Sequence, residues 1–184
     1  MNNNLRELLG SWIQAIGTII DAISNTPLYK LSETHQSNLS LIGHVMQATG
    51  NALIADSVKE CNFEKIGNTI QSLGNLTIIS SILIKLFEEI KIELTIKGNL
   101  LQALGNFLSP FSGSVDDRTS NKDKLLLDLG SILQGIGNSL QALSGMLLLK
   151  GGDRGDSHVL GSWIQASGAV LQAVVRSKAA CVQK

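Results

Sequence analysis

The sequence is poor in charged residues, aromatic residues, proline and cysteine, and these shortages exclude several classes of protein. Only 16% of the 184 residues are charged, and 15 Lys and Arg balance 15 Asp and Glu. A chain without net charge lacks the basic surface by which nucleic-acid-binding proteins attract phosphate, so we expect no nucleic-acid partner. The two cysteines, Cys61 and Cys181, form no Cys-x-x-Cys site and are too few for a disulfide scaffold, so we predict two free thiols.

The N-terminal residues lack the pattern of a secretory signal peptide. Glu7 interrupts the start of the apolar stretch, and no small-residue cleavage site follows a clean apolar run. We therefore expect a cytoplasmic location by default, with membrane association or non-classical export as the alternatives. A length of 184 residues is enough for one domain with a core but short for two, so we expect a single α-helical repeat domain over residues 1–184.

Catalytic and cofactor-binding motifs are also missing. No phosphate-binding glycine loop of the two common kinds occurs, and no histidine has a second metal ligand at helical spacing. The three histidines are His35, His44 and His158. We interpret His44 as ordinary variation within a repeat, and Glu88, Glu89 and Glu93 as a solvated helix face that forms ion pairs with the interleaved lysines. We therefore predict no catalytic residue, no metal site and no cofactor.

What the sequence does have is a twelve-residue phrase that occurs six times. Its consensus is apolar-Gly-polar-x-apolar-Gln-small-x-Gly-Asn-x-apolar, and its copies occupy residues 9–20, 42–53, 66–77, 97–108, 129–140 and 160–171. The two glycines of each copy are seven residues apart, which brings them to nearly the same face of a helix. The apolar residues also recur at helical spacing, so each copy predicts an amphipathic α-helix.

The repeated glycines predict close helix packing. Twelve of the 18 glycines belong to the phrase: Gly10, Gly17, Gly43, Gly50, Gly67, Gly74, Gly98, Gly105, Gly130, Gly137, Gly161 and Gly168. Glycine inside a helix costs roughly 0.5–1 kcal/mol relative to alanine, and close approach between helix backbones would compensate for this cost. On a helical wheel the apolar residues form a stripe bordered by small residues, with Gln and Asn roughly opposite.

The glutamine of each phrase is its most specific polar feature. The six copies provide Gln14, Gln47, Gln71, Gln102, Gln134 and Gln165. Because an amide offers two donors and two acceptor sites, one interpretation is a polar ladder that joins helices or subunits. The alternative is that glutamine serves as a good helix former on an exposed face. We interpret Trp12 and Trp163 as core residues, with anchors at a membrane interface as the alternative.

Turn residues and the repeat together predict six helices. They cover approximately residues 5–24, 37–60, 63–94, 97–109, 122–149 and 158–178. No proline or glycine turn separates the third helix from the fourth, so one long bent helix over residues 63–108 is an alternative. The Arg-Gly-Asp tripeptide at 154–156 is interpreted as part of an interhelical turn. We predict an all-α fold, a six-helix repeat protein that packs as an antiparallel bundle or a short α-solenoid with glycine-lined helix faces.

Apart from Lys97, charged residues are absent from the repeats and gather between them. Runs without Asp, Glu, Lys or Arg cover residues 34–55, 66–84, 98–115, 129–149 and 157–175. Each run has about the twenty residues needed to cross the hydrocarbon core of a bilayer. The Gln, Asn, Ser and Thr residues in these runs would be costly to bury in lipid unless they were paired.

Two of the phrases, LGSWIQAIGT at 9–18 and GNLLQALGN at 98–106, resemble an uncharacterised family of repetitive proteins from Gram-positive spore-forming bacteria. The resemblance extends from residue 5 to about residue 175. Lys97 at an apolar position, and Thr18 and Ala169 at the position of the repeated Asn, depart from the pattern. The resemblance implies no activity, cofactor or catalytic residue.

These observations predict a non-catalytic structural or assembly protein. A chain that repeats one helix offers similar surfaces inside and outside, so we expect it to bind copies of itself as a homo-oligomer or filament, or to bind a helical partner. The alternative is a membrane-active or pore-forming protein that inserts charge-free helical hairpins into lipid.

Overall fold

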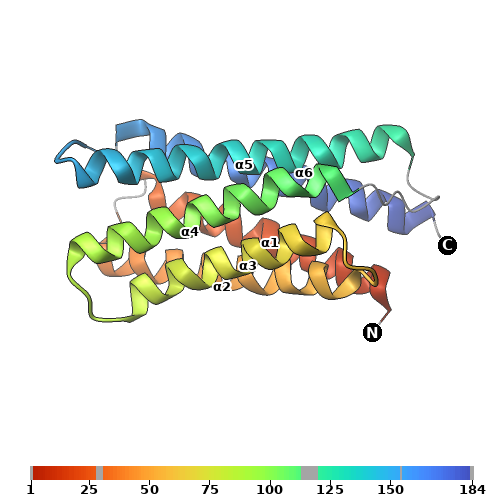
Figure 1. Ribbon diagram of the computed structural model, residues 1–184, viewed down its shortest axis with the longest axis horizontal. Coiled ribbons are helices and arrows are strands. Elements are labelled where there is room, and N and C mark those ends of the chain that lie inside the picture. Colours follow the sequence, from red (N-terminus) through yellow and green to blue (C-terminus); the bar gives the residue numbers. More distant parts are fainter. Residues whose placement is uncertain (1, 28–30, 113–119, 154, 183–184) are drawn as a thin grey trace.

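The computed structural model describes residues 2–27, 31–112, 120–153 and 155–182, which form six α-helices and one short 3-10 helix. The helices run nearly parallel to one long axis (Figure 1). Their bounds are α1 Asn3–Asn25, α2 Glu33–Ser57, α3 Phe63–Leu83, α4 Glu88–Leu108, η2 Ser109–Ser112, α5 Asn121–Leu149 and α6 Gly155–Val182. The described residues contain no strand, and the predicted all-α fold with six helices is confirmed.

Four of the helices begin at a side chain that caps the free backbone N–H groups of the first turn. The capping side chains belong to Asn2, Ser32, Asn62 and Ser120. Asn and Ser are favoured at this position because their side-chain oxygen accepts one of the hydrogen bonds that the helix cannot provide itself. These caps explain why helices start directly after the short polar connections.

The predicted boundary between the third and fourth helices is wrong. Helix α3 ends at Leu83 rather than near residue 94, and the charged stretch that follows the connection 84–87 forms the first half of α4. The single bent helix over residues 63–108 is excluded as well. The reason lies in the tertiary structure, because the chain must reverse direction here for α3 and α4 to pack side by side. This packing outweighs the local helical pattern, although no proline or glycine turn interrupts that pattern.

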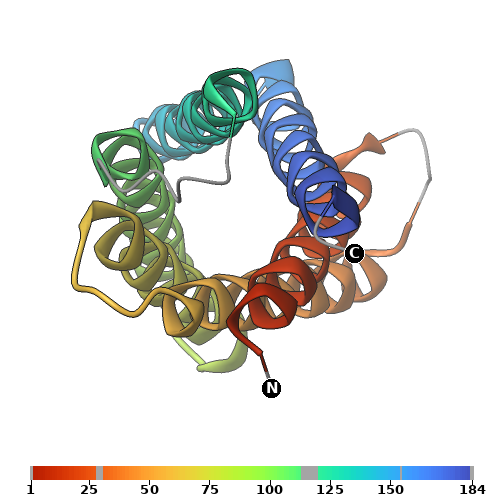
Figure 2. The same ribbon diagram turned by 90° about the vertical axis from the view of Figure 1, so that its right-hand side faces the viewer.

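The six helices form a closed ring. Helices adjacent in sequence pack against each other, and α6 packs against α1 to complete the circle. Figure 2 views this ring along its axis, with α1 and α6 side by side. The architecture is therefore a bundle of three antiparallel hairpins, α1–α2, α3–α4 and α5–α6, and the predicted solenoid alternative is wrong.

The burial pattern is inverted relative to an ordinary globular protein. The buried apolar residues are mostly alanines, together with Ile54, Ile78, Ile96 and Val175, and no described Leu, Phe, Trp or Met is buried. Gln, Asn and Ser dominate the interior instead. The prediction that Trp12 and Trp163 are core residues is wrong, because their side chains are 39% and 38% exposed. The apolar stripe of each helix faces outward, so the small and polar residues face the axis of the ring.

Candidate functional site

The repeated glycines bring the two helices of each hairpin into backbone contact. Gly10 lies opposite Gly50, and Gly17 lies opposite Gly43. The other two hairpins repeat the arrangement with the pairs Gly67–Gly105, Gly74–Gly98, Gly130–Gly168 and Gly137–Gly161. A Cβ added to Gly50 would lie 2.5 Å from the carbonyl oxygen of Gly10, a distance that real Cβ atoms do not reach. Any larger residue would therefore force the two helices apart.

The repeated glutamines meet on the axis of the ring in two sets of three. The first set, which we call the odd triad, comprises Gln14, Gln71 and Gln134 from α1, α3 and α5. Gln14 Nε2 donates to Gln134 Oε1 at 2.8 Å and approaches Gln71 Oε1 at 3.5 Å. All three side chains are buried.

The second set, the even triad, comprises Gln47, Gln102 and Gln165 from α2, α4 and α6. Gln165 Nε2 donates to Gln47 Oε1 at 3.0 Å and to Gln102 Oε1 at 3.2 Å. These side chains are also buried. Because each triad takes one residue from every hairpin, the triads connect the three hairpins through the centre of the ring.

Two further glutamines extend the triads and were missed at the sequence level. Gln134 Nε2 donates to Gln172 Oε1 at 2.8 Å, and Gln141 Nε2 donates to Gln165 Oε1 at 2.8 Å. Gln141 and Gln172 each lie seven residues after a repeated glutamine. The heptad spacing that relates the glycines could therefore have identified them.

A cavity of about 190 Å³ lies at the end of the ring where α1, α3 and α5 begin, and we call it the Arg176 cavity. Arg176 Nε donates to Glu7 Oε1 at 2.7 Å, and its Nη2 donates to Glu64 Oε1 at 3.2 Å. Burial raises the pKa of Glu64, and nearby Glu7 adds to the effect, although Arg176 opposes it. The two carboxylates hold the pKa of Arg176 above its usual value despite its burial. This cluster was not predicted from the sequence, because Glu7 and Arg176 lie far apart along the chain, in the first and last helices.

A smaller cavity of about 80 Å³ lies at the opposite end, lined by Asp21, Ser40 and His44 among others. His44 is buried, its Nδ1 lies 2.9 Å from Asn75 Oδ1, and its Nε2 lies 3.5 Å from Asp21 Oδ1. The Ser40 hydroxyl donates to Asp21 at 2.9 Å rather than to His44. The imidazole is therefore not placed to take the serine proton, which nucleophilic catalysis would require.

The remaining residues singled out from the sequence lie apart from these sites. Cys61 and Cys181 are exposed free thiols, as predicted. Glu88 pairs with Lys91 and Glu93 pairs with Lys97, which confirms the solvated charged face on α4. The described residues contain no cluster of three His, Cys, Asp or Glu side chains that could hold a metal ion. Residue 154 of the Arg-Gly-Asp tripeptide lies outside the described part of the chain.

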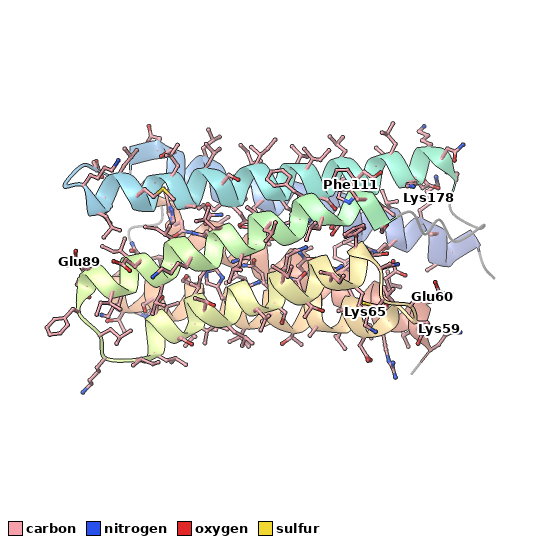
Figure 3. The ribbon with its side chains drawn as sticks, viewed as in Figure 1. Lys59, Glu60, Lys65, Glu89, Phe111 and Lys178 are labelled. Carbon is pink, nitrogen blue, oxygen red and sulfur yellow. The ribbon has the colours of Figure 1, made fainter. Side chains whose placement is uncertain are left out.

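The outside of the ring carries large apolar side chains on all six helices, and we call this surface the apolar wall. Its exposed residues include Leu9, Trp12, Ile16, Ile42, Val45, Ile66, Leu73, Leu76, Leu100, Leu104, Phe107, Leu129, Ile132, Ile136, Leu143, Leu160, Trp163 and Val174. Charged residues gather toward the ends, where Figure 3 labels Lys59, Glu60, Lys65 and Lys178 at one end and Glu89 at the other.

The chain belongs to a family of unknown function (DUF6944), whose model matches residues 5–173. This range contains all six copies of the repeated phrase. No curated protein and no solved structure matches the chain.

Proposed function

We propose that this chain is a non-catalytic structural protein that resides in a lipid bilayer as a closed six-helix ring. The carrying observation is the inverted burial: Gln, Asn and Ser dominate the interior, and most of the large apolar side chains face outward. Large exposed apolar surfaces mark sites of membrane or protein contact, because leaving them in water is unfavourable. Acyl chains would cover the apolar wall without any penalty for the polar interior.

Lipid fits the wall better than a single protein partner because the wall has no favoured side. Exposed apolar residues occur on every helix around the ring. A dimer contact would cover one or two neighbouring helices and leave the others in water. A bilayer surrounds the ring on all sides.

The helix lengths support this placement. The helices contain 21 to 29 residues. At about 1.5 Å per residue they span about 32–44 Å, enough to cross a hydrocarbon core of about 30 Å. On α4 the charge-free run starts only at Gly98, and the adjacent Lys97 pairs with Glu93 at 3.0 Å. Lys97 lies near the middle of α4, too far from either end for its side chain to reach the interface, so in a bilayer its charge would depend on the pairing with Glu93.

The packing inside the ring also has the character of a membrane bundle. Helices in lipid associate through small residues that let backbones approach and through polar side chains that bond across the interface. The glycine pairs and the two glutamine triads supply these two kinds of contact.

Hydroxyl groups on the apolar wall form hydrogen bonds within their own helices. The hydroxyls of Thr49, Thr69, Thr77 and Ser167 each donate to the carbonyl four residues earlier at 2.8–2.9 Å. Such bonds satisfy a hydroxyl donor that faces hydrocarbon. These residues are therefore compatible with a lipid-facing surface.

The two tryptophans point to opposite ends of the wall. Trp12 Nε1 donates to Ser177 near the end of α6, and Trp163 Nε1 donates to Thr26 at the end of α1. Because α1 and α6 are antiparallel neighbours, these partners lie at opposite ends of the ring. Tryptophan is enriched at both interfaces of a membrane, which supports the interpretation of Trp12 and Trp163 as anchors.

By length and composition alone, α5 is the helix among the described residues that could cross a membrane. An average over a whole helix understates the outward face here, because each helix turns its Gln, Asn and Ser residues toward the axis. The outward face of each helix is therefore more apolar than the mean hydropathy of the whole helix.

Self-association remains the second candidate, because copies of the chain could also cover the apolar wall. In that case the protein would build an oligomer or filament in water. The apolar residues on all six helices would then require contacts in several directions, which favours a lattice or filament over a dimer.

Lipid association can be tested with the full-length chain and liposomes. We expect the protein to float with liposomes after an alkaline wash, and lipids brominated on their acyl chains to quench the fluorescence of Trp12 and Trp163. The double variant Ile16→Lys and Leu104→Lys should reduce flotation, because lysine in the hydrocarbon region is costly. Phe87→Lys, a matched change in the exposed connection between α3 and α4, should leave flotation unchanged.

A chain that stays in solution without detergent, ignores liposomes and shows no quenching would refute membrane residence. Light scattering of that soluble material would then decide the second candidate. Large assemblies would support self-association, and a strict monomer at high concentration would refute it.

A further inference from the structure

The Arg176 cavity is a polar pocket at one end of the ring. Its volume of about 190 Å³ exceeds the roughly 150 Å³ of an engineered apolar cavity that admits benzene, so it has room for a small organic molecule. Lys65 and Lys178, labelled in Figure 3, mark the end of the ring where the cavity lies. A pocket with convergent buried polar side chains is the usual form of a small-molecule site.

Two buried side chains of α3 each leave one polar atom unpaired in the lining. Asn68 is 6% exposed, and its Nδ2 donates to the carbonyl of Glu64, whereas its Oδ1 has no partner among the described residues. Gln71 is 4% exposed, and its Oε1 lies 3.5 Å from Gln14 Nε2, whereas its own Nε2 has no partner there.

These two unpaired atoms face the cavity. Asn68 Oδ1 and Gln71 Nε2 keep accessible surface, in contrast to the sealed Nε2 atom of Gln102 on the axis. Because both residues are otherwise buried and line the cavity, that surface belongs to the cavity. Asn68 and Gln71 are three residues apart on one face of α3, so one small molecule can reach both. The cavity therefore presents one free acceptor and one free donor.

The lining is acidic overall, which favours a cation over an anion or a neutral molecule. Four lining residues are acidic and two are basic, namely Glu7, Glu64, Asp123, Asp128, Lys124 and Arg176. Two of the carboxylates hold Arg176, and Lys178 pairs with Asp123 at 2.8 Å. The carboxylates thus outnumber the cations even when Lys178 is counted.

Asp128 is the lining carboxylate that a cationic ligand would pair with. It has no ion pair in the described part of the chain, and burial raises its pKa although Lys124 opposes the shift. A bound cation would stabilise a carboxylate that the protein itself leaves without a full partner.

The lining also restricts the kind of cation. Its described residues include no Phe, Tyr or Trp, so the aromatic cage that holds a quaternary ammonium group is missing. A primary ammonium group instead donates three hydrogen bonds, which suits the carboxylates and Asn68 Oδ1. A metal ion would supply no acceptor for Gln71 Nε2, whereas a hydroxyl oxygen next to the ammonium group would.

We propose that the Arg176 cavity binds a small amino alcohol, a compound with a primary ammonium group and a hydroxyl group. The ammonium group lies against Asp128 and donates to Asn68 Oδ1, and the hydroxyl oxygen accepts from Gln71 Nε2. Arg176 remains bound to Glu7 and Glu64 and contacts no ligand atom in this arrangement. The site does not depend on whether lipid or protein covers the apolar wall.

Ligand-observed NMR on the full-length chain tests the proposal, in detergent or in buffer according to which medium keeps the chain helical. Saturation transfer to ethanolamine should be saturable. Propylamine replaces its hydroxyl by a methyl group and should bind about fivefold more weakly, whereas ethylene glycol replaces its ammonium by a hydroxyl group and should bind at least about tenfold more weakly. Equal binding of either probe, or no saturable binding of ethanolamine, would overturn the proposal.

Two further probes distinguish other sources of the same chemistry. Choline, whose quaternary ammonium group donates no hydrogen bond, should bind more weakly than ethanolamine. Phosphoethanolamine represents a lipid headgroup and should also bind more weakly, because its phosphate would meet the carboxylates. Tighter binding of phosphoethanolamine would assign the cavity to a headgroup and refute a free amino alcohol.

Three variants locate the binding. Asp128→Asn should weaken ethanolamine binding at least about tenfold, the effect of losing a hydrogen bond to a charged group. Ala180→Phe should abolish binding by filling the cavity that Ala180 lines. Asp156→Asn, the same change in charge at the opposite end of the ring, should have no effect. All three variants should keep the circular dichroism of the unmodified chain, and unchanged binding in Asp128→Asn or Ala180→Phe would refute the assigned site.

Discussion

Gly17 and Gly43 face each other across the α1–α2 contact so closely that a Cβ on Gly17 would lie 2.7 Å from the carbonyl oxygen of Gly43, and a Cβ on Gly43 would lie 2.8 Å from that of Gly17. The contact is reciprocal, and both atoms that would clash are backbone atoms. Neither helix can relieve the clash by rotating a side chain. The distance between the helices is therefore set by the absence of side chains at these two residues.

Replacing Gly17 by alanine should destabilise the ring although alanine is the better helix former. We expect a loss of about 1–3 kcal/mol in the free energy of unfolding, typical of overpacking. Thermal or denaturant unfolding followed by circular dichroism measures it. Thr49→Ala, on the exposed side of the neighbouring α2, provides the control and should cause little change. An increase in stability for Gly17→Ala would show that the helix backbones are not in contact.

Replacing Gln134 by leucine should destabilise the interior. Gln134 accepts from Gln14 and donates to Gln172, so leucine leaves Gln172 Oε1 without its donor and leaves Gln14 Nε2 with only its 3.5 Å approach to Gln71. Each unsatisfied group costs about 1–3 kcal/mol. A double-mutant cycle with Gln14→Leu measures the coupling, and we expect the two losses to be clearly non-additive. Strictly additive losses would argue against a direct bond between these amides.

The carboxyl groups of the Arg176 cavity should give opposite pH dependences. Burial raises the pKa of Glu64 above 4.5, so the folded chain binds that proton more tightly than the unfolded chain. The contribution of Glu64 to stability is then fully present below the unfolded pKa and is lost as the pH rises through the folded pKa. Relative to Glu64→Gln, the unmodified chain should become less stable as the pH rises from about 4.5 through the raised pKa of folded Glu64.

Asp123 should show the reverse behaviour and serves as the internal comparison. Hydrogen bonds from Lys178 and Ser120 lower its pKa below 3.8, so its contribution is present above the unfolded pKa and is lost as the pH falls through the folded pKa. Relative to Asp123→Asn, the unmodified chain should lose stability on acidification. Equal pH profiles for the Glu64→Gln and Asp123→Asn variants would contradict both assignments.

The closure of the ring between α1 and α6 should depend on an indole N–H. Trp163 Nε1 donates to the hydroxyl of Thr26 at 3.0 Å. Trp163→Phe keeps a large apolar ring but removes this donor, and we expect a loss of about 0.5–1.5 kcal/mol in the free energy of unfolding. Phe107→Leu, on the wall of α4, is a control change in an aromatic residue without a hydrogen bond. A Trp163→Phe variant as stable as the unmodified chain would show that the bond does not hold the ring closed.

The number of helices and their approximate positions could be predicted from the sequence because the repeat is regular. The period of the apolar residues identifies a stripe on each helix, and the glycine spacing marks one edge of that stripe. Neither observation shows which face of a helix points to the axis of the ring. Interpreting Trp12 and Trp163 as core residues relied on the assumption that apolar side chains are buried, and this assumption does not hold here. The recurrence of Gln14 and its equivalents on one face was the stronger signal for the interior.

Other features depend on contacts between distant parts of the chain. The connection after Leu83 follows from how α3 and α4 pack, and nothing in the local sequence interrupts the helix there. Arg176 meets Glu7 and Glu64 only because the last helix lies beside the first in a closed ring. A pattern read along one chain does not reveal such a contact.

The contact between α6 and α1 also means that the order of the helices along the chain is only one of several that would produce the same ring. The start of α1 and the end of α6 lie at the same end of the molecule (Figure 1). A short linker could join them while the chain is opened at a connection between two hairpins, such as residues 58–62. The fold should therefore tolerate circular permutation, with each hairpin able to serve as the first.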